Sequence, residues 1–110
     1  MISILERDDM SWSLFLDDNR DPKTDRDWKI ARSVAEAKHL VQLLGVPEYI
    51  SFDHDLDENG TGYDFARWLV EQELEGRLRI PVNFDFNVHS ANAIGATNIY
   101  YYLKGYLKQR

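Results

Sequence analysis

The chain has 110 residues, a formal net charge of −6 and no cysteine. This length suits one domain with a core large enough to fold alone, and without cysteine the chain has no disulfides, thiolate metal sites or cysteine nucleophiles. An acidic chain with no basic cluster is poorly suited to binding a nucleic acid polymer through its phosphates. No apolar run approaches the ~18 residues that span a bilayer, and residues 6–9 are charged where a signal peptide needs an apolar core. We therefore expect a cytoplasmic protein that does not bind membranes.

Two short strands are expected in the first third of the chain. Residues 1–11 begin apolar and turn acidic, which leaves open whether they are an extension or an edge strand of the domain that residues 12–110 form. Trp12–Leu16 is the first predicted strand. Residues 18–27 are rich in Asp, Asn and Pro, so they predict a loop with little room for a helix. Trp28–Arg32 then forms a short second strand.

A helix is predicted after this strand, because Ser33 and Glu36 have the spacing of a capping box, in which each side chain binds the other residue's backbone N–H. Gly45 is placed to end the helix, and Pro47 prevents its continuation. The apolar residues repeat at helical spacing. They are Val34, Ala37, Leu40, Val41 and Leu44.

The segment Tyr49–Leu56 begins as a short apolar strand and runs directly into Asp53, His54 and Asp55. Gly45 and Pro47 precede this strand, and Gly60 and Gly62 follow it. Such boundaries are typical of a short buried strand. Its polar residues should therefore lie where the strand leaves the sheet.

A second helix should begin near Gly62, because Thr61 and Asp64 repeat the capping-box spacing, and it should end at Gly76. The side chains that it is expected to bury are Phe65, Ala66, Leu69, Val70 and Leu74.

The last part of the chain contains one further predicted strand, Phe84–Val88, which His89 follows, and Arg79–Val82 can add an edge segment. Ser90 is a candidate N-cap for a final helix. The apolar residues expected on that helix are Ile94, Ile99, Leu103 and Leu107.

The predicted order of elements is β-β-α-β-α-β-α, an α/β pattern that implies a mostly parallel sheet of four to five strands with right-handed crossovers. In such a sheet the carboxyl ends of the strands and the N-termini of the helices share one edge, where ligands bind. Three strands end there in acids or histidine: the first in Asp17 and Asp18, the central one in Asp53–Asp55, and the last in His89.

Four acids are the candidate metal ligands: Asp17, Asp18, Asp53 and Asp55. Carboxylates that are forced close together repel one another, and a hard divalent cation such as Mg²⁺ or Mn²⁺ relieves that repulsion. The alternative is that these acids are helix caps and solvated loop residues. A calcium loop of the EF-hand type fits less well, because its twelfth position, counted from Asp55, is Ala66 and not the required Glu.

His89, His54 and Asp53 are the candidate catalytic residues, since imidazole changes its charge near neutral pH and can transfer protons. The alternative for each histidine is a structural role, in which it caps a loop or orients a carboxylate. Arg20 can reach a ligand phosphate, although an arginine in an acidic loop is more often an ion-pair partner of its neighbours.

Four short motifs, in this order and spacing, resemble the receiver-like family described as cyclic-phosphate-processing receiver domains. They are Leu14–Pro22, Ser51–Leu56, Thr61–Asp64, and His89–Asn92 with Gly95 and Asn98. The resemblance implies a reduced response-regulator receiver, a flavodoxin-like three-layer sandwich with Asp17, Asp18 and Asp53 at the metal and acid-pocket positions. It also implies that the activity is hydrolysis or other processing of a cyclic phosphate.

Three functions remain open. The first is metal-dependent, phosphodiesterase-like hydrolysis of a cyclic phosphate or cyclic nucleotide, with Ser90, Asn92 and Asn98 orienting the ligand. The second is a non-catalytic receiver-like module that binds a nucleotide or a protein partner. The third is a receiver in which Asp53 accepts a phosphoryl group. The third is the weakest, because His89 stands where a receiver has a lysine at the end of its last strand.

Overall fold

Four parallel strands form the sheet in a computed structural model that describes residues 11–56 and 60–110. The strands are β1 (Ser13–Leu16), β2 (Trp28–Ala31), β3 (Tyr49–Phe52) and β4 (Asp85–Val88). Their order across the sheet is β2-β1-β3-β4, and all three neighbouring pairs are parallel. The expected extension or edge strand of residues 1–11 lies, apart from Ser11, outside the described residues.

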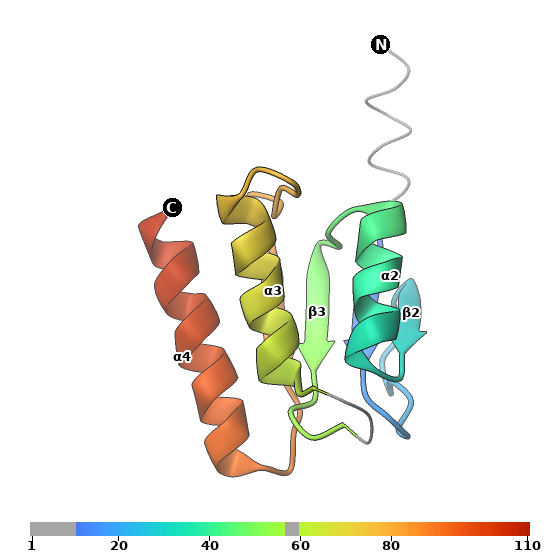
Figure 1. The fold of residues 1–110 in the computed structure, drawn as a ribbon. Helices are drawn as coiled ribbons and strands as arrows, with labels where there is room; N and C mark the ends of the chain where they lie inside the picture. The colour runs from blue at the N-terminus through green and yellow to red at the C-terminus, as the bar shows by residue number, and fades with distance from the viewer. Residues whose placement is uncertain (1–10, 57–59) are drawn as a thin grey trace.

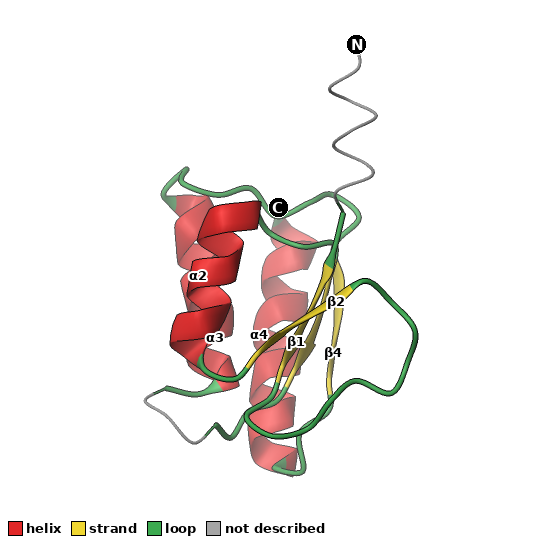
Figure 2. Cartoon of the chain, turned by 90° about the vertical axis from the view of Figure 1, so that its right-hand side faces the viewer, coloured by secondary structure: helices red, strands yellow, loops and turns green. Residues whose placement is uncertain are grey.

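Three helices form a row in front of the sheet (Figure 1). They are α2 (Val34–Leu44), α3 (Gly62–Leu74) and α4 (Ala93–Gln109). Figure 2 shows the helices on one side of the sheet and the loop between β1 and β2, residues 17–27, on the other. The connection from β1 to β2 runs toward the edge of the sheet, and the connection from β2 through α2 to β3 runs back across β1. Because right-handed crossovers in opposite directions lie on opposite faces, these two connections are on different sides of the sheet. None of the helices in the described part of the chain has the length and apolar character that crossing a membrane requires.

The predicted α/β receiver-like fold with a parallel sheet is confirmed. The layers differ from the expectation of a three-layer sandwich, because α2, α3 and α4 cover the same face and residues 11–56 and 60–110 place no helix on the other face. The physical reason is the connection from β1 to β2, which contains no helix among residues 17–27. Among the described residues, this loop and no helix covers the second face of the sheet.

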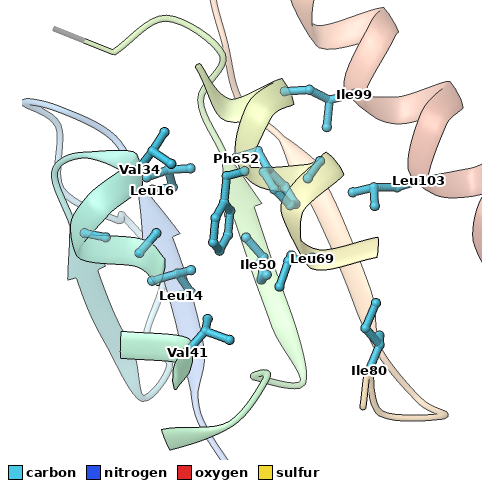
Figure 3. Close-up of a cluster of buried hydrophobic side chains, with 14 of the residues drawn as sticks. Leu14, Leu16, Val34, Val41, Ile50, Phe52, Leu69, Ile80, Ile99 and Leu103 are labelled. Carbon is cyan, nitrogen blue, oxygen red and sulfur yellow. The ribbon is translucent and has the colours of Figure 1, made fainter. Parts of the chain in front are cut away.

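The hydrophobic core lies between the sheet and the helices, because alternate residues of a strand face opposite sides of the sheet. On β1 and β3 the residues facing the helices are Leu14, Leu16, Ile50 and Phe52, and all four are fully buried. Figure 3 shows them together with Val34, Val41, Leu69, Ile99 and Leu103 from the three helices. This packing fixes the ends of the strands relative to the starts of the helices.

Side-chain caps start the first two helices where the sequence predicts them. The Ser33 hydroxyl accepts from the Glu36 N–H at 3.1 Å. Thr61 and Asp64 form the full capping box, with hydrogen bonds of 3.2 and 2.8 Å. Gly45 ends α2 with a φ of 88°, in the left-handed region where only glycine is free of strain.

The final helix begins later than expected, and Asn92 caps it in place of Ser90. The Asn92 Oδ1 accepts from the Gly95 N–H at 2.9 Å. The Ser90 hydroxyl accepts from the Asn92 N–H at 3.0 Å, in the turn that precedes the helix. Leu74, which the sequence predicts to be buried, is 70% exposed because it lies in the last turn of α3. Leu44 and Ile94, from the apolar positions expected on the other two helices, also lie in terminal turns and are 42% and 77% exposed.

The expected edge segment Arg79–Val82 forms no strand. The Ile80 N–H donates to the Glu73 carboxylate at 2.8 Å and not to a neighbouring strand. Glu73 also accepts from the Tyr106 hydroxyl at 2.6 Å and forms an ion pair with Arg110 at 3.3 Å. Burial by itself raises the pKa of Glu73, but these bonds and the Arg110 charge outweigh it and hold the pKa below its usual value. They attach the end of α4 to α3.

Candidate active site

Asp17, Asp53 and His89 meet at the carboxyl edge of the sheet, each directly after a strand. Leu16 and Phe52 pair in register, and the next residues continue the ladder. The Asp53 N–H donates to the Leu16 carbonyl at 2.9 Å, and the His89 N–H donates to the Phe52 carbonyl at 2.8 Å. As a result, one ligand atom from each of the three side chains lies within 4.8 Å of the other two.

Asp17 is fully buried, and both of its carboxylate oxygens have two partners. Oδ1 accepts from the backbone N–H groups of Asn19 and Arg20 at 3.0 and 2.8 Å. Oδ2 binds the Arg20 Nε and the His89 Nε2, each at 2.9 Å. Burial by itself raises the pKa of Asp17, but these hydrogen bonds and the Arg20 charge outweigh it, so the pKa lies below its ordinary value. Asp17 is therefore an anion at neutral pH.

Arg20 links the two buried acids of the cluster. Its Nε binds Asp17, and its Nη2 lies 3.5 Å from the Asp53 Oδ2. The side chain remains half exposed, so it connects the buried acids with the solvent. Arg32 holds the loop in this position by donating to the Arg20 carbonyl at 2.6 Å and to the Asp21 carboxylate at 2.6 Å. The predicted ion-pair role of Arg20 is therefore present, and its exposed side leaves it able to contact a phosphate.

His89 is held on three sides. Its Nε2 binds Asp17 at 2.9 Å, its Nδ1 lies 2.7 Å from the Ser51 hydroxyl, and its ring stacks on Phe15 with a centroid distance of 4.6 Å. Sequence reasoning gave Ser51 no role. The available signal was a small polar residue between Ile50 and Phe52 in a buried strand, since such a residue faces the side of the sheet opposite its two apolar neighbours.

His54, Asp55 and Asn92 form a second cluster. The His54 Nδ1 lies 2.8 Å from the Asp55 Oδ1, which also accepts from the Asn92 Nδ2 at 3.1 Å. These bonds hold the pKa of Asp55 below its usual value, the His54 bond contributing most. The His54 ring also packs against Gly95, where an added Cβ would lie only 2.4 Å from the ring. This cluster joins the loop after β3 to the start of α4.

The remaining predicted site residues lie outside both clusters. Asp18 is half-buried next to Asp17, but in the described part of the chain it belongs to no group that could hold a metal ion. Ser90 is half-buried ahead of α4, and its hydroxyl accepts a backbone N–H. Asn98 is exposed on α4. The roles predicted for these residues stay predictions.

A cavity of about 560 Å³ adjoins the cluster on the face of the sheet without helices. Its floor is the sheet, and its roof is the loop between β1 and β2. Aromatic and cationic side chains predominate in its lining: Phe15, Trp28 and Tyr49, with Arg20, Lys23 and Arg26. Ser51 and His89 also line it, so the cavity opens onto the polar cluster.

The donor set of Asp17, Asp53 and His89 fits a divalent cation, because carboxylate oxygens and imidazole nitrogens are common ligands of such ions. The Arg20 guanidinium now supplies positive charge to the same two carboxylates. A metal ion would therefore take over the ion pairs of Arg20. This group could hold a metal ion, and among the described residues Asp55 is not part of it.

In a comparison with protein families, the sequence model of the cyclic-phosphate processing receiver domain matches residues 12–105. Comparison with curated proteins and with solved structures gives no significant match.

Proposed function

The chain belongs to the family of cyclic-phosphate processing receiver domains, and from this premise we propose that it hydrolyses a cyclic phosphate in a metal-dependent reaction. The observation that carries the proposal is the meeting of Asp17, Asp53 and His89 within 4.8 Å of one another. Two buried acids, one imidazole and the nearby Arg20 guanidinium offer metal ligands, a proton carrier and a phosphate contact in one place.

Asp17 and Asp53 would be the main ligands of Mg²⁺ or Mn²⁺. Asp18 and Asp55 stay proposed as weaker contributors, because among the described residues they lie outside the group that could hold a metal ion. When bound, such an ion polarises a phosphoryl oxygen and lowers the pKa of a coordinated water. The two acids lie at the ends of adjacent strands, whose pairing keeps their backbones fixed. The site is therefore organised before a ligand arrives, which avoids an ordering cost on binding.

We assign proton transfer to His89. Its hydrogen bond to Asp17 and its stacking on Phe15 fix the ring plane, and its other nitrogen faces the cavity wall at Ser51. A fixed imidazole beside the phosphate can take up a proton and return it to the leaving oxygen. The sequence also makes His54 a catalytic candidate, but its bond to Asp55 favours a role in positioning the loop that carries Asp53.

The cavity supports a nucleotide as the cyclic phosphate ligand. Trp28 and Tyr49 suit a flat base, because every nucleobase has a π-face that stacks on aromatic rings. A base stacked there would take the place of the Arg26 guanidinium, which lies 4.1 Å from the Tyr49 ring centroid. The three cations of the cavity suit the charge of the phosphate. Arg20 would contact the phosphate, and Ser90, Asn92 and Asn98 stay proposed ligand contacts at the start of α4. Asn92 already uses both side-chain groups within the protein, so its contribution would be to shape the site.

A metal-free binding module is the second candidate function, and one observation favours it. Arg20 already forms ion pairs with both Asp17 and Asp53, so part of the positive charge that these acids require is present without a metal ion. Such a module would bind the ligand phosphate on the exposed side of Arg20 and release it unchanged. A receiver with Asp53 as phosphoryl acceptor remains the third prediction, which labelling with acetyl phosphate would test.

The deciding experiment is a turnover assay with a panel of 2′,3′- and 3′,5′-cyclic nucleotides in Mg²⁺ or Mn²⁺, with products separated by chromatography. We expect one class to be opened to a nucleoside monophosphate, and a chelator to stop the reaction. The matched variant is Asp85→Ala, which removes an exposed acid from the opposite end of β4 and should leave turnover unchanged. Binding without turnover in any metal would select the binding module.

A further inference from the structure

Ser51, His89 and Asp17 form a continuous chain of hydrogen bonds that neither of the proposed functions uses in full. The Ser51 Oγ lies 2.7 Å from the His89 Nδ1, and the His89 Nε2 lies 2.9 Å from the Asp17 Oδ2. The three residues come from three neighbouring strands, β3, β4 and β1, at or just beyond their carboxyl ends. A hydroxyl, an imidazole and a carboxylate in this order are the groups that activate a serine for nucleophilic attack.

The bonding of Asp17 decides the direction of these hydrogen bonds. Both carboxylate oxygens of Asp17 already accept hydrogen bonds, Oδ1 from the backbone N–H groups of Asn19 and Arg20 and Oδ2 from the Arg20 Nε, so Asp17 is bound as a carboxylate. A carboxylate anion can only accept, so the His89 Nε2 must carry the proton in the bond between them. The Nδ1 of neutral His89 is then an acceptor, and the Ser51 hydroxyl donates to it. This is the tautomer that a serine nucleophile requires.

Ser51 is accessible to a ligand although it is only 4% exposed. It lines the cavity of about 560 Å³ together with His89 and Arg20. A phosphate group on the exposed side of Arg20 would enter from this cavity and meet the hydroxyl. The serine is therefore placed where the proposed ligand would react.

We propose that Ser51 is the nucleophile of this site, with His89 as its base and Asp17 as the residue that orients His89. The inference rests on the proposed function, and it adds a covalent step to it. The Ser51 Oγ forms a bond to phosphorus while a P–O bond of the ring breaks, and the serine proton passes through His89 to the released ring oxygen. Water then attacks phosphorus and gives one proton to His89, the bond between phosphorus and Oγ breaks, and His89 passes that proton to the Ser51 oxygen. The net change is the addition of one water.

The first test uses a fluorophosphonate, an electrophilic phosphorus probe that reports on an activated serine without any cyclic substrate. We expect the wild-type chain to gain one probe, located at Ser51 by mass spectrometry of peptides. Ser51→Ala and His89→Ala should remove the label, and Ser13→Ala, which changes a buried serine on the neighbouring strand β1, should retain it. A folded wild-type chain that stays unlabelled, or a label that persists in Ser51→Ala, would overturn the proposal.

The second test exploits the absence of cysteine from the chain. Ser51→Cys introduces a single thiol beside His89, and a thiol next to a proton-accepting imidazole has more thiolate at neutral pH. We expect it to react with iodoacetamide at pH 7 about 10-fold faster than Asn87→Cys. Asn87 is the matched position because it pairs with Ser51 in register, lines the same cavity and is more exposed. A slower reaction at position 51 than at 87 would show that His89 does not activate it.

Turnover of the cyclic substrate separates this inference from the proposed function. If the wild-type chain hydrolyses a cyclic nucleotide, acid quenching should trap Ser51 carrying the whole ligand, and Ser51→Ala should lose at least ~10²-fold in rate. Full turnover by Ser51→Ala would reject the nucleophile and keep the hydrolase. A label at Ser51 in a chain that hydrolyses no cyclic phosphate would keep the nucleophile and reject the proposed substrate.

Discussion

The Nε of Arg20 donates to the Oδ2 of Asp17 over 2.9 Å, so the protein itself supplies positive charge to a fully buried acid. The same guanidinium approaches Asp53 at 3.5 Å. A divalent cation at these acids has to compete with a side chain that is already bound there. The occupancy of this site by a metal ion would therefore depend partly on the protein's own arginine.

Arg20→Met should strengthen Mn²⁺ binding, because it removes the competing charge and keeps most of the side chain's length. A hydrogen bond to a charged group contributes ~1.5–3 kcal/mol, so a gain of about 10-fold in affinity is expected. Titration calorimetry measures it. The control is Lys23→Met, which removes another cation of the same loop and cavity. Weaker metal binding by Arg20→Met would mean that the guanidinium supports the metal site.

Asp53→Ala should abolish Mn²⁺ binding and leave the fold intact, because it removes one of two buried carboxylates that repel each other. Asp55→Ala is the informative comparison, since Asp55 is bonded to His54 and Asn92 and lies outside the group that could hold a metal ion among the described residues. It should retain most of the affinity. Equal losses in the two variants would support the four-acid site expected from the sequence.

His89→Ala should lower the turnover of the cyclic substrate by ~10²–10⁴-fold, the usual contribution of a general acid–base group. Ligand affinity should fall less, because Arg20 and the cavity walls remain. Separate measurement of kcat and of the equilibrium affinity distinguishes the two effects. His39→Ala, on the exposed side of α2, is the control. Equal losses in rate and affinity would make His89 a binding residue.

Gly95→Ala should destabilise the fold by ~1–3 kcal/mol, the typical cost of forcing extra atoms into a packed site. The added Cβ would lie 2.4 Å from the His54 ring, so the ring and its bond to Asp55 would have to move. Gly105→Ala, in the same helix, meets nothing within 4 Å and should stabilise by ~0.5–1 kcal/mol. Denaturant unfolding measures both. Similar stability in the two variants would show that His54 repacks without cost.

The free energy of unfolding should depend on the bond between Tyr106 and Glu73 at both ends of the pH scale. The folded-state pKa of Glu73 is lowered, so its contribution is present above the unfolded pKa and is lost as the pH falls through the folded one. Burial and the Glu73 bond raise the pKa of Tyr106 to about 12, so its contribution is lost as the pH rises from about 10 to about 12.

Tyr106→Phe removes this bond and tests both dependences. It should be less stable than the wild type at pH 7, and its stability should decline less steeply in acid and above pH 10. Thermal unfolding across this pH range measures the difference. Parallel curves for the two proteins would show that the pair contributes nothing to the pH dependence.

Local signals in the sequence were sufficient for the helix starts at Ser33 and Thr61 and for the strand ends at Asp17, Asp53 and His89. A capping box needs only residues three apart, and parallel strands in register must end at one edge of the sheet. The same local reasoning was wrong about the cap of the last helix, which it placed at Ser90. Serine and asparagine are both good N-caps. Asn92 is the cap in the structure, where Gly95 of the first turn packs against His54.

Only the tertiary structure decided which side chains act together. Asp53 and Asp55 are two residues apart, yet one joins Asp17 and the other joins Asn92, because the chain turns as it leaves the strand. The bond between Ser51 and His89 links residues 38 positions apart, and no local pattern specifies it. The open face of the sheet likewise depends on where the connections between strands pass. Distances of a few ångströms between distant segments are set by the packing of the whole core, whereas caps and strand ends are set by neighbours in the sequence.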